Sequence, residues 1–374
     1  MHGSNGRVQT GPTIRDVALH AGVSVATVSR VINDSPHKVH PVTRRRVLRA
    51  VAHLGYYPNA VAQGLRRGTT RTIALIVPDI SNPFFPAVAR GVEDVARRHG
   101  YALVLGNTDG DAARERAYLE ILRKRWVDGV LFASASGDAR PLRMLRAGGV
   151  PAVLIAREAT DGEIDTVLVD SFAGMRLATA HLLRLGHRRI AYIGGPRGLP
   201  VARERLRGYR QALRDQGICP DPRLVVAGDF RVEGGRTAVR RLLARRSTFT
   251  ALAAANDLMA IGAMEALRAA GRRIPDDVAV VGFDDIPFAA FVDPPLTTVA
   301  QPTYRLGALA MERLLALMRG EAGAPRRMVL KPQLVVRRSC GGPPSPRRVG
   351  GTAARLRPVP MRPAKHSVPR EEMG

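Results

Sequence analysis

The sequence contains little cysteine and no apolar run long enough to cross a bilayer. Of its 374 residues only Cys219 and Cys340 are cysteine, and they lie far apart with no metal-ligand spacing around them. This distribution fits a reducing cytosol and excludes a cysteine-based zinc site. The N-terminus also lacks the apolar segment of an export signal. We therefore expect a soluble, cytoplasmic protein with neither a membrane span nor a bound metal.

Acidic residues and lysine are also scarce. The chain has 32 Asp and Glu against 58 Lys and Arg, a formal net charge of +26, and only four of these cations are lysine. A charge of this size indicates a polyanionic partner. Residues 1–70 hold ten of the cations and two acids, so most of the excess lies elsewhere. We interpret most of those other arginines as a solvated surface.

The chain lacks the residue patterns of common catalytic sites as well. His181 and His187 lie six residues apart and have no acidic partner at ligand spacing. Gly194-Gly195-Pro196 resembles a phosphate loop, but no Lys-Ser/Thr pair follows it. No serine stands in a nucleophile-elbow sequence. We therefore expect no enzymatic activity and no cofactor.

The most informative stretch is residues 13–32, which has the spacing of two short helices joined by a tight turn. Gly22 stands where the turn needs a positive φ, and Ser24 can cap the second helix. Val28 and Val31 fall on the inner face of that helix. The pattern predicts a helix-turn-helix whose second helix fits a DNA major groove, and a helical hairpin without a nucleic-acid role is the alternative. The outer face carries Val25, Ala26, Ser29 and Arg30.

The residues that follow extend this small helical unit. We expect a third helix from Pro41 to about Leu54, because Pro58 disfavours helical geometry at the residue before it. A short segment from Asn59 to Arg67 comes next, and the texture of the sequence then changes.

From residue 71 onward, short apolar runs alternate with amphipathic stretches. Such runs are typical of parallel strands that helices cover on both faces. We predict an α/β fold of doubly wound parallel sheets with right-handed crossovers. The expected strands are 72–77, 102–105, 129–133, 152–156, 190–194, 224–227, 252–255 and 278–283. The expected helices include 86–99, 112–124, 171–185, 203–216, 234–244 and 258–270.

The number of expected strands indicates two lobes, because eight or more strands exceed one comfortable doubly wound sheet. We place the division near residue 169. After about Gly341 the chain turns to Pro, Arg and Gly without periodicity, so the tail 341–374 is expected to be disordered.

Six short motifs agree in residue type, order and separation with those of a known family: Thr13–Val31, Asn59–Leu65, Asn82-Pro83-Phe84-Phe85, Arg203–Tyr209, Asn256-Asp257 and Val281–Asp285. Over about residues 13–340 the chain resembles the LacI/GalR family of bacterial transcription regulators. The resemblance implies a helix-turn-helix headpiece (13–58), a hinge helix (59–67) and an effector-binding and dimerisation core (71–340) similar to periplasmic sugar-binding proteins. Three crossings would join the lobes, with lobe 1 at about 71–168 and 298–325, and lobe 2 at about 169–297 and 326–340.

The resemblance places DNA contacts on the second helix and around it. Val25, Ala26 and Arg30 fall at the family's base-reading positions. Arg30 can donate two parallel hydrogen bonds to guanine O6 and N7, whereas the two apolar side chains suit the methyl group of thymine. Hydroxyl and amide groups suit phosphate contacts, and the matching positions are Ser24, Thr27, Asn33, Tyr56 and Asn59.

The segment 59–67 is expected to act as the hinge helix. The resemblance implies that it folds when two copies meet over the operator's minor groove, where Leu65 wedges between the central base steps. Gly64 weakens the helix, which is consistent with folding only on DNA. Paired hinges need a homodimer on a pseudopalindromic operator. Pro and Arg replace the family's C-terminal leucine heptad, so we expect no tetramer.

Positions similar to those that line ribose-type pockets carry side chains suited to a small polyol. Phenyl rings cover the weakly apolar faces of a sugar ring, and Arg, Asp, Asn and Gln supply directional hydrogen bonds. Asp284 follows the strand 278–283, where open α/β sheets place ligands. The alternative is that Phe84 and Phe85 are core residues and that Asp284 caps a turn. The expected effector-binding residues are Asn82, Phe84, Phe85, Arg157, Arg205, Phe230, Asn256, Asp284 and Gln301.

Two departures from the family pattern bear on the ligand. The family often has an acid before Arg157, and this chain has Ala156 there. Ser171 replaces the usual Asn after Asp170. The loss of one hydroxyl-accepting group leaves the identity of the sugar open.

The whole pattern predicts a ligand-responsive regulator, most simply a repressor of genes for sugar uptake or use. Lobe closure on the effector would change operator affinity by shifting a two-state equilibrium. A purine-type corepressor is the nearest competitor, although Asn256 and Gln301 favour a sugar. A solute-binding protein that feeds a transporter and a sugar-modifying enzyme are the alternatives from other classes.

Overall fold

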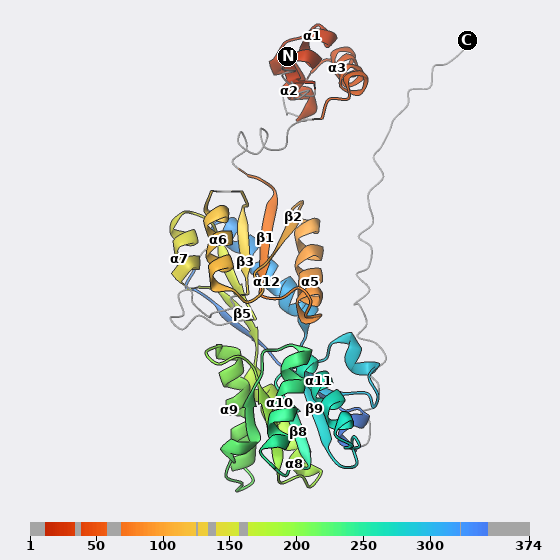
Figure 1. The fold of residues 1–374 in the computed structure, drawn as a ribbon. Helices are drawn as coiled ribbons and strands as arrows, with labels where there is room; N and C mark the ends of the chain where they lie inside the picture. Colours follow the sequence, from red (N-terminus) through yellow and green to blue (C-terminus); the bar gives the residue numbers. More distant parts are fainter. Residues whose placement is uncertain are drawn as a thin grey trace, which may run out of the picture.

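The computed structural model describes residues 12–33, 39–57, 69–124, 126–133, 140–156, 164–321 and 323–342. These residues form a small helical headpiece and a core of two α/β lobes (Figure 1). In the described part of the chain, no helix is both long enough and apolar enough to cross a membrane.

The headpiece consists of three helices, α1 (Ile14–Ala21), α2 (Val25–Ile32) and α3 (Pro41–Leu54). They enclose a cluster of small apolar side chains, which lets the short helices approach each other closely. The buried members of this cluster are Val17, Ala18, Ala21, Val28, Val31, Val47 and Ala50.

Local capping explains where the first two helices begin and end. Thr13 caps α1 and forms a capping box with Asp16. Gly22 ends α1 with a φ of 57°, a left-handed conformation open to glycine at little cost. Ser24 caps α2 by accepting a hydrogen bond from the backbone N–H of Thr27. The predicted turn at Gly22 and cap at Ser24 are confirmed.

The first lobe is built on a six-stranded sheet in the order β11-β5-β4-β3-β1-β2. All neighbouring strands in it are parallel. The strands are β1 (Thr72–Val77), β2 (Ala102–Asn107), β3 (Gly129–Phe132), β4 (Ala152–Ile155), β5 (Thr166–Val169) and β11 (Arg327–Leu330).

Helices cover both faces of this sheet. Ile73 and Leu75 of β1 pack toward α5 and α12, whereas Ala74 and Ile76 pack toward α6 and α7. Burial on both sides explains why β1 reads as a continuous apolar run. The helices are α5 (Phe84–Arg98), α6 (Ala112–Arg123), α7 (Arg140–Ala147) and α12 (Thr303–Met318).

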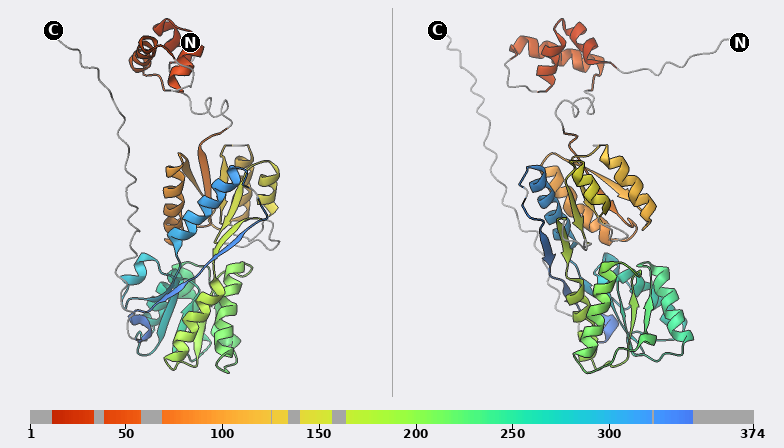
Figure 2. Two further views of the ribbon diagram at one scale, coloured as in Figure 1. Left: turned by 180° about the vertical axis from the view of Figure 1, so that it is seen from behind. Right: turned by 90° about the vertical axis from the view of Figure 1, so that its left-hand side faces the viewer.

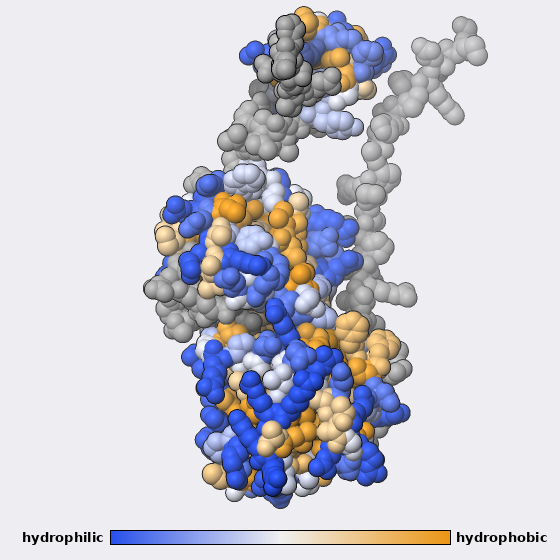
Figure 3. Space-filling model, viewed as in Figure 1, coloured by the Kyte–Doolittle hydropathy of each residue, from blue (hydrophilic) through white to orange (hydrophobic). Residues whose placement is uncertain are grey.

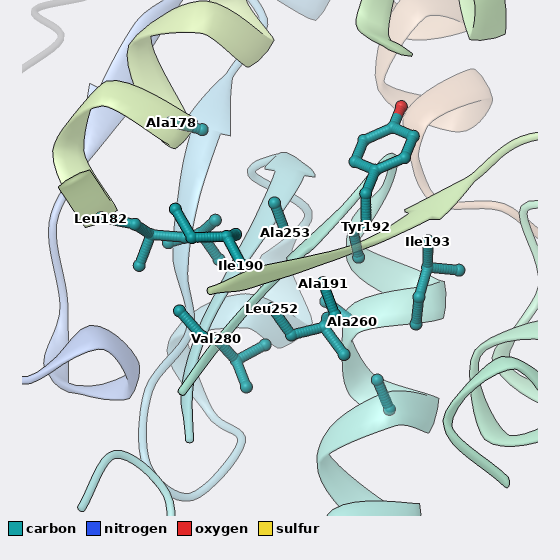
Figure 4. Close-up of a cluster of buried hydrophobic side chains, with 14 of the residues drawn as sticks. Ala178, Leu182, Ile190, Ala191, Tyr192, Ile193, Leu252, Ala253, Ala260 and Val280 are labelled. Carbon is teal, nitrogen blue, oxygen red and sulfur yellow. The ribbon is translucent and has the colours of Figure 1, made fainter. Parts of the chain in front are cut away.

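The second lobe repeats this architecture with the order β12-β10-β9-β8-β6-β7, in which only β12 is antiparallel to its neighbour. Figure 4 shows part of its core, where β6 side chains meet Leu252 and Val280 of β8 and β9. The strands are β6 (Ile190–Gly194), β7 (Val225–Ala227), β8 (Ala251–Ala254), β9 (Ala279–Asp284), β10 (Thr297–Ala300) and β12 (Gln333–Val335). The helices are α8 (Ser171–Arg184), α9 (Pro200–Arg214), α10 (Val232–Ala244) and α11 (Asp257–Ala269), with short 3-10 turns at Pro222–Leu224, Pro287–Ala290 and Arg338–Cys340.

The chain passes between the lobes three times: after β5, after β10, and between β11 and β12. These connections lie together on one side of the core in the right-hand view of Figure 2. Connections gathered on one side in this way are typical of domains that close about a hinge.

Two strands differ from the lobe boundaries expected from the sequence. β10 pairs with β9 in the second sheet, whereas residues 298–325 are expected in lobe 1. β11 pairs with β5 in the first sheet, whereas residues 326–340 are expected in lobe 2. Each strand has four residues and lies beside a crossing, so its apolar pattern does not indicate which sheet it joins. The expected hinge helix 59–67 and tail residues 343–374 lie outside the described residues.

Candidate ligand cleft and nucleic-acid interface

A cavity of about 300 Å³ lies between the two lobes. Most of its polar wall follows the carboxyl ends of strands in both sheets. Open α/β sheets place ligands at this edge, and two sheets that face each other enclose a ligand from both sides. The wall residues at or after strand ends are Asp79, Asp109, Ala156, Ser171, Asp229, Phe230, Asn256, Asp284 and Gln301.

The structure brings the residues expected to bind effector together at this cavity. It places eight of them on the wall: Asn82, Phe84, Phe85, Arg205, Phe230, Asn256, Asp284 and Gln301. The ninth, Arg157, lies outside the described residues.

The polar centre of the cavity is the carboxylate of Asp284. The Gln301 side-chain amide donates a hydrogen bond to Asp284 Oδ1 at 2.7 Å, and Arg205 Nη1 lies 3.7 Å from the same oxygen. Both Arg205 and Asp284 are about 5% exposed, so little water screens their charges. Together, these three residues offer a ligand an anionic acceptor, the Asp284 carboxylate, and two kinds of donor, the Gln301 amide and the Arg205 guanidinium.

Arg205 is held in place by contacts on several sides. Its guanidinium donates to the carbonyl oxygen of Ala255 and, at 3.5 Å, to the Ser171 hydroxyl. Its Cζ lies 3.8 Å from the centre of the Phe283 ring, a distance at which a cation and an aromatic face attract. Burial lowers the pKa of Arg205, and the Asp284 carboxylate opposes that shift.

Phenyl rings form the apolar part of the wall. Phe84 and Phe85 contact each other edge-to-face with centroids 5.0 Å apart. Phe230 comes from the other lobe and lies over Gly195, where a Cβ would fall 2.2 Å from its ring. Asn256 donates from its side-chain amide to the Phe230 carbonyl at 2.9 Å and also caps α11. Part of the Asn256 side chain therefore orients the wall.

Asp257 lies behind the cavity as a fully buried carboxyl group. It accepts hydrogen bonds from the Thr298 hydroxyl at 2.5 Å and from the backbone N–H of Ile286 at 2.9 Å. Burial and the nearby Asp284 carboxylate raise the pKa of Asp257 well above its usual range. Asp284, beside Arg205, is the carboxyl group that faces the cavity.

Strained backbone concentrates around the cavity. Four non-glycine residues of its wall have positive φ: Asp109 (53°), Ala156 (55°), Phe230 (67°) and Asp284 (123°). Such conformations persist only where the surroundings enforce them, and they gather at binding sites. Here they turn side chains at strand ends toward the space between the lobes.

One ion pair spans the cleft. Arg231 of the second lobe lies 3.1 Å from the Asp79 carboxylate of the first lobe, and Ser81 donates to the other oxygen of Asp79. Burial acts to raise the pKa of Asp79, but the bonds from Ser81 and Arg231 outweigh it, and the net shift is downward. Both residues line the cavity.

The headpiece presents the expected base-reading face on α2. Val25, Ala26 and Arg30 are exposed, whereas Val28 and Val31 on the opposite face are buried. Figure 3 shows polar and apolar side chains mixed over the headpiece surface. The arrangement leaves one cation and two small apolar groups free to meet a groove.

The described residues among the expected phosphate contacts lie on α2 or near it, and several of their polar atoms already form hydrogen bonds within the headpiece. Ser24 Oγ and Thr27 Oγ1 are 2.9 Å apart at the helix N-terminus. The Asn33 amide donates to the Ser29 carbonyl at 2.7 Å, at the other end of α2. Tyr56 is half-buried at the end of the headpiece. Asn59 and the expected wedge Leu65 lie outside the described residues.

Two family models match the sequence. "Bacterial regulatory proteins, lacI family" matches residues 13–59, and "Periplasmic binding protein-like domain" matches residues 179–340. The ribose operon repressor of Halalkalibacterium halodurans is 41% identical over 330 residues, which cover 88% of this chain and 97% of that relative. The chain belongs to the LacI family.

Solved LacI-family structures agree with this assignment. A complex of the transcriptional regulator CelR with cellobiose has a TM-score of 0.69 at 40% identity, and the lac repressor dimer bound to operator and the anti-inducer ONPF has 0.79 at 31%. Each match covers 88% of this chain and 99% of the other. The fold class and the regulator class predicted from the sequence are confirmed.

The two departures of this LacI-family chain both lie on the cavity wall. Ala156 lines it without a polar group, and Ser171 accepts a hydrogen bond from Arg205. The described residues contain no group of three or more His, Cys, Asp or Glu side chains placed to hold a metal ion.

Several wall residues were not predicted from the sequence. Asp79, Asp109 and Asp229 each come directly after a strand and one short turn, so the rule that singled out Asp284 applies to them too. Leu199, Val201 and Arg231 lie at the starts of α9 and α10 and carry no comparable signal.

Proposed function

We propose that this LacI-family protein is a dimeric transcriptional repressor whose affinity for operator DNA is controlled by a monosaccharide bound between its lobes. The observation that carries the proposal is the group of Asp284, Gln301 and Arg205, which faces a cavity walled by phenyl rings. Sugar hydroxyls need such a mixture of acceptors and donors. The cleft would bind its ligand without catalysing a reaction on it. Binding to an operator implies a cytoplasmic location.

We assign two tasks to the wall. Asn82, Arg205, Asp284, Gln301 and Arg157 would bond to hydroxyl groups. Phe84, Phe85 and Phe230 would cover the faces of the sugar ring, and Asn256 would hold Phe230 in position.

A thermal-shift screen of monosaccharides, polyols and nucleobases tests the proposal. A ligand that binds only the folded protein raises its Tm. We expect one or more monosaccharides to raise Tm and to change operator affinity in a mobility-shift titration. Failure of every sugar in both measurements would contradict the proposal.

A purine or nucleoside corepressor is the second candidate. The same phenyl rings and Arg205 could also stack on and bind a base. If hypoxanthine or adenosine raises Tm and no sugar does, the purine assignment replaces the sugar assignment.

For DNA, we propose base contacts from Val25, Ala26, Arg30 and Leu65. The proposed phosphate contacts are Ser24, Thr27, Asn33, Tyr56 and Asn59. The exposure of Val25, Ala26 and Arg30 on one face of α2 supports this assignment, because a recognition helix needs one solvent-exposed face.

We also propose a homodimer that binds a pseudopalindromic operator, with a headpiece (13–58), a hinge (59–67) and a core (71–340) in each copy. The edge strand β2 supports it, since Val104 is 53% and Leu105 is 40% exposed. Figure 3 shows apolar side chains along this part of the first lobe. An unpaired apolar edge is a usual site of protein association.

A further inference from the structure

Asp128, immediately before β3, holds the point where the chain enters the first lobe. Its Oδ1 accepts hydrogen bonds from the backbone N–H of Thr70 at 2.6 Å and from the Thr70 hydroxyl at 2.8 Å. Its Oδ2 accepts a hydrogen bond from the backbone N–H of Arg71 at 2.9 Å. The backbone N–H of Asp128 donates to the Thr72 carbonyl at 2.8 Å. One residue thus holds three successive residues of the entering chain.

The held segment has a bend that needs such support. Arg71 has a φ of 54°, a backbone conformation that residues other than glycine and asparagine rarely adopt. Its guanidinium lies 5.3 Å from the centre of the Tyr101 ring, and its carbonyl accepts a hydrogen bond from Ala102 at 2.9 Å. The bend at Arg71 sets the direction in which the preceding chain leaves the lobe.

The position of this clamp in the molecule gives it a role. Residues 58–68 join the headpiece covalently to the core, so Thr70 belongs to the first stretch of the core that the chain reaches. Asp128 stands at the amino end of β3, whereas the cleft lies at the carboxyl ends of the strands. The sheet and α12 therefore lie between the clamp and the ligand site.

Helix α12 connects the two ends of the lobe. α12 begins at Thr303, two residues after the cavity residue Gln301. Farther along, the Leu314 side chain packs on Gly129, where a Cβ would fall 3.1 Å from it. Gly129 is the neighbour of Asp128, so α12 packs against the strand that carries the clamp.

We propose that Asp128 is a positioning residue for operator binding, which fixes the exit direction of the DNA-binding part of the chain and transmits lobe movement to it. The second role, transmission of lobe movement by Asp128, rests on the proposed control by an effector. The first role, fixing the exit direction of the chain, does not, because it concerns the protein without any ligand.

The test compares D128A with wild type and with D221A. Asp221 is a matched control, since it is a half-buried carboxylate that accepts a backbone N–H, that of Arg223 at 2.9 Å, but it lies in the second lobe. Operator duplexes are selected from a random library by the wild-type protein. Kd values are then measured by fluorescence anisotropy without sugar and with D-ribose, D-galactose or cellobiose.

We expect D128A to raise the operator Kd about tenfold without sugar and to reduce the sugar-induced change in Kd to below about twofold. The Kd of the protein for the sugar itself, measured by calorimetry, stays at the wild-type value, which a general loss of structure would not allow. D221A matches wild type throughout. If D128A does not fold, the same measurements are made on D128N. The Asn side-chain oxygen can still accept the hydrogen bond from the Thr70 backbone N–H, but its amide nitrogen cannot accept the one from the Arg71 backbone N–H.

A D128A protein that binds operator as wild type does without sugar would overturn the positioning role. If its operator Kd rises but its response to sugar stays intact, transmission through Asp128 is wrong. A wild-type protein that binds operator but ignores every sugar would contradict the proposed function and transmission together, and the sugar-free comparison would still decide on positioning.

Discussion

Asp284 combines three features at one residue: a strained backbone, a buried charge and a position on the cavity wall. Its carboxylate is compensated by Gln301 and Arg205. A ligand hydroxyl that reaches it meets an anionic acceptor with little competing water, and hydrogen bonds to charged groups contribute about 1.5–3 kcal/mol.

The variant D284N keeps the shape of this side chain and removes its charge. We expect sugar affinity to fall by about that 1.5–3 kcal/mol, while operator affinity without sugar stays unchanged. Isothermal calorimetry and anisotropy measure the two quantities. D215N, on the outer surface of the second lobe, is the control. Sugar binding by D284N at wild-type affinity would show that the Asp284 carboxylate does not bind the sugar.

Arg30 is the one cation among the proposed base-reading residues. The variant R30A should lose discrimination at one guanine in each half-site by about 1–3 kcal/mol. Competition between the operator and variants altered at single base pairs measures this loss. R45A, which removes an exposed arginine of α3, should leave discrimination unchanged. If R30A ranks all operator variants as wild type does, the base contact is wrong.

At the scale of elements, the sequence predicted best what its local pattern encodes. The turn at Gly22, the cap at Ser24 and strands such as β1 follow from capping chemistry and continuous apolar runs. β5, β10, β11 and β12 were not predicted, because three or four residues at a crossing carry no readable period. α12 was not predicted as an element either, although the family resemblance placed its residues in lobe 1.

The residues of the candidate site likewise fall into those that the sequence predicted and those that it did not. Residues that belong to a family motif, such as Asp284 and Asn256, were predicted and lie on the cavity, whereas Asp79 follows a predicted strand without a motif and was not predicted. Arg231 was not, because its place opposite Asp79 depends on how the two lobes face each other. No pattern within one element encodes that relation.

The crossing of α5 and α12 depends on glycine. A Cβ at Gly307 would lie 2.1 Å from the Val88 carbonyl oxygen, so the backbones would have to separate. We expect G307V to destabilise the core by about 1–3 kcal/mol or more, measured by urea unfolding. G323A is the control, since a Cβ there has no neighbour within 4 Å among the described atoms. Wild-type stability of G307V would contradict this packing.

Helix α8 carries a histidine that links it to the end of the core. His181 Nε2 lies 3.3 Å from Cys340 Sγ, and burial, followed by Arg184 and His187, lowers the pKa of His181. A base with a lowered pKa in the folded state takes up its proton more readily when unfolded, so this group destabilises the fold as pH falls through about 6.5. We expect Tm to fall less for H181Q than for wild type between about pH 7.5 and 5.5. Equal losses in a thermal scan would refute the assignment.

At the scale of the whole molecule, the Asp79–Arg231 pair joins the lobes across the cleft. Arg231 is about half exposed, so the pair contributes only about 0–1 kcal/mol. That is enough to bias a hinge equilibrium whose states differ by a few kcal/mol. We expect R231A to increase the radius of gyration of the sugar-free core in X-ray scattering and to weaken sugar binding by less than about tenfold. An unchanged radius and affinity would show that the pair does not hold the lobes.

In the proposed mechanism, one molecule couples a sugar in the cleft to a duplex at the headpiece. This coupling is tested by measuring the Kd for a selected operator duplex as sugar is titrated. A scrambled duplex of the same length is measured at the same salt concentration. We expect tight, sequence-specific binding whose Kd changes about tenfold with at least one sugar. An operator Kd equal to that of the scrambled duplex at every sugar concentration would contradict it.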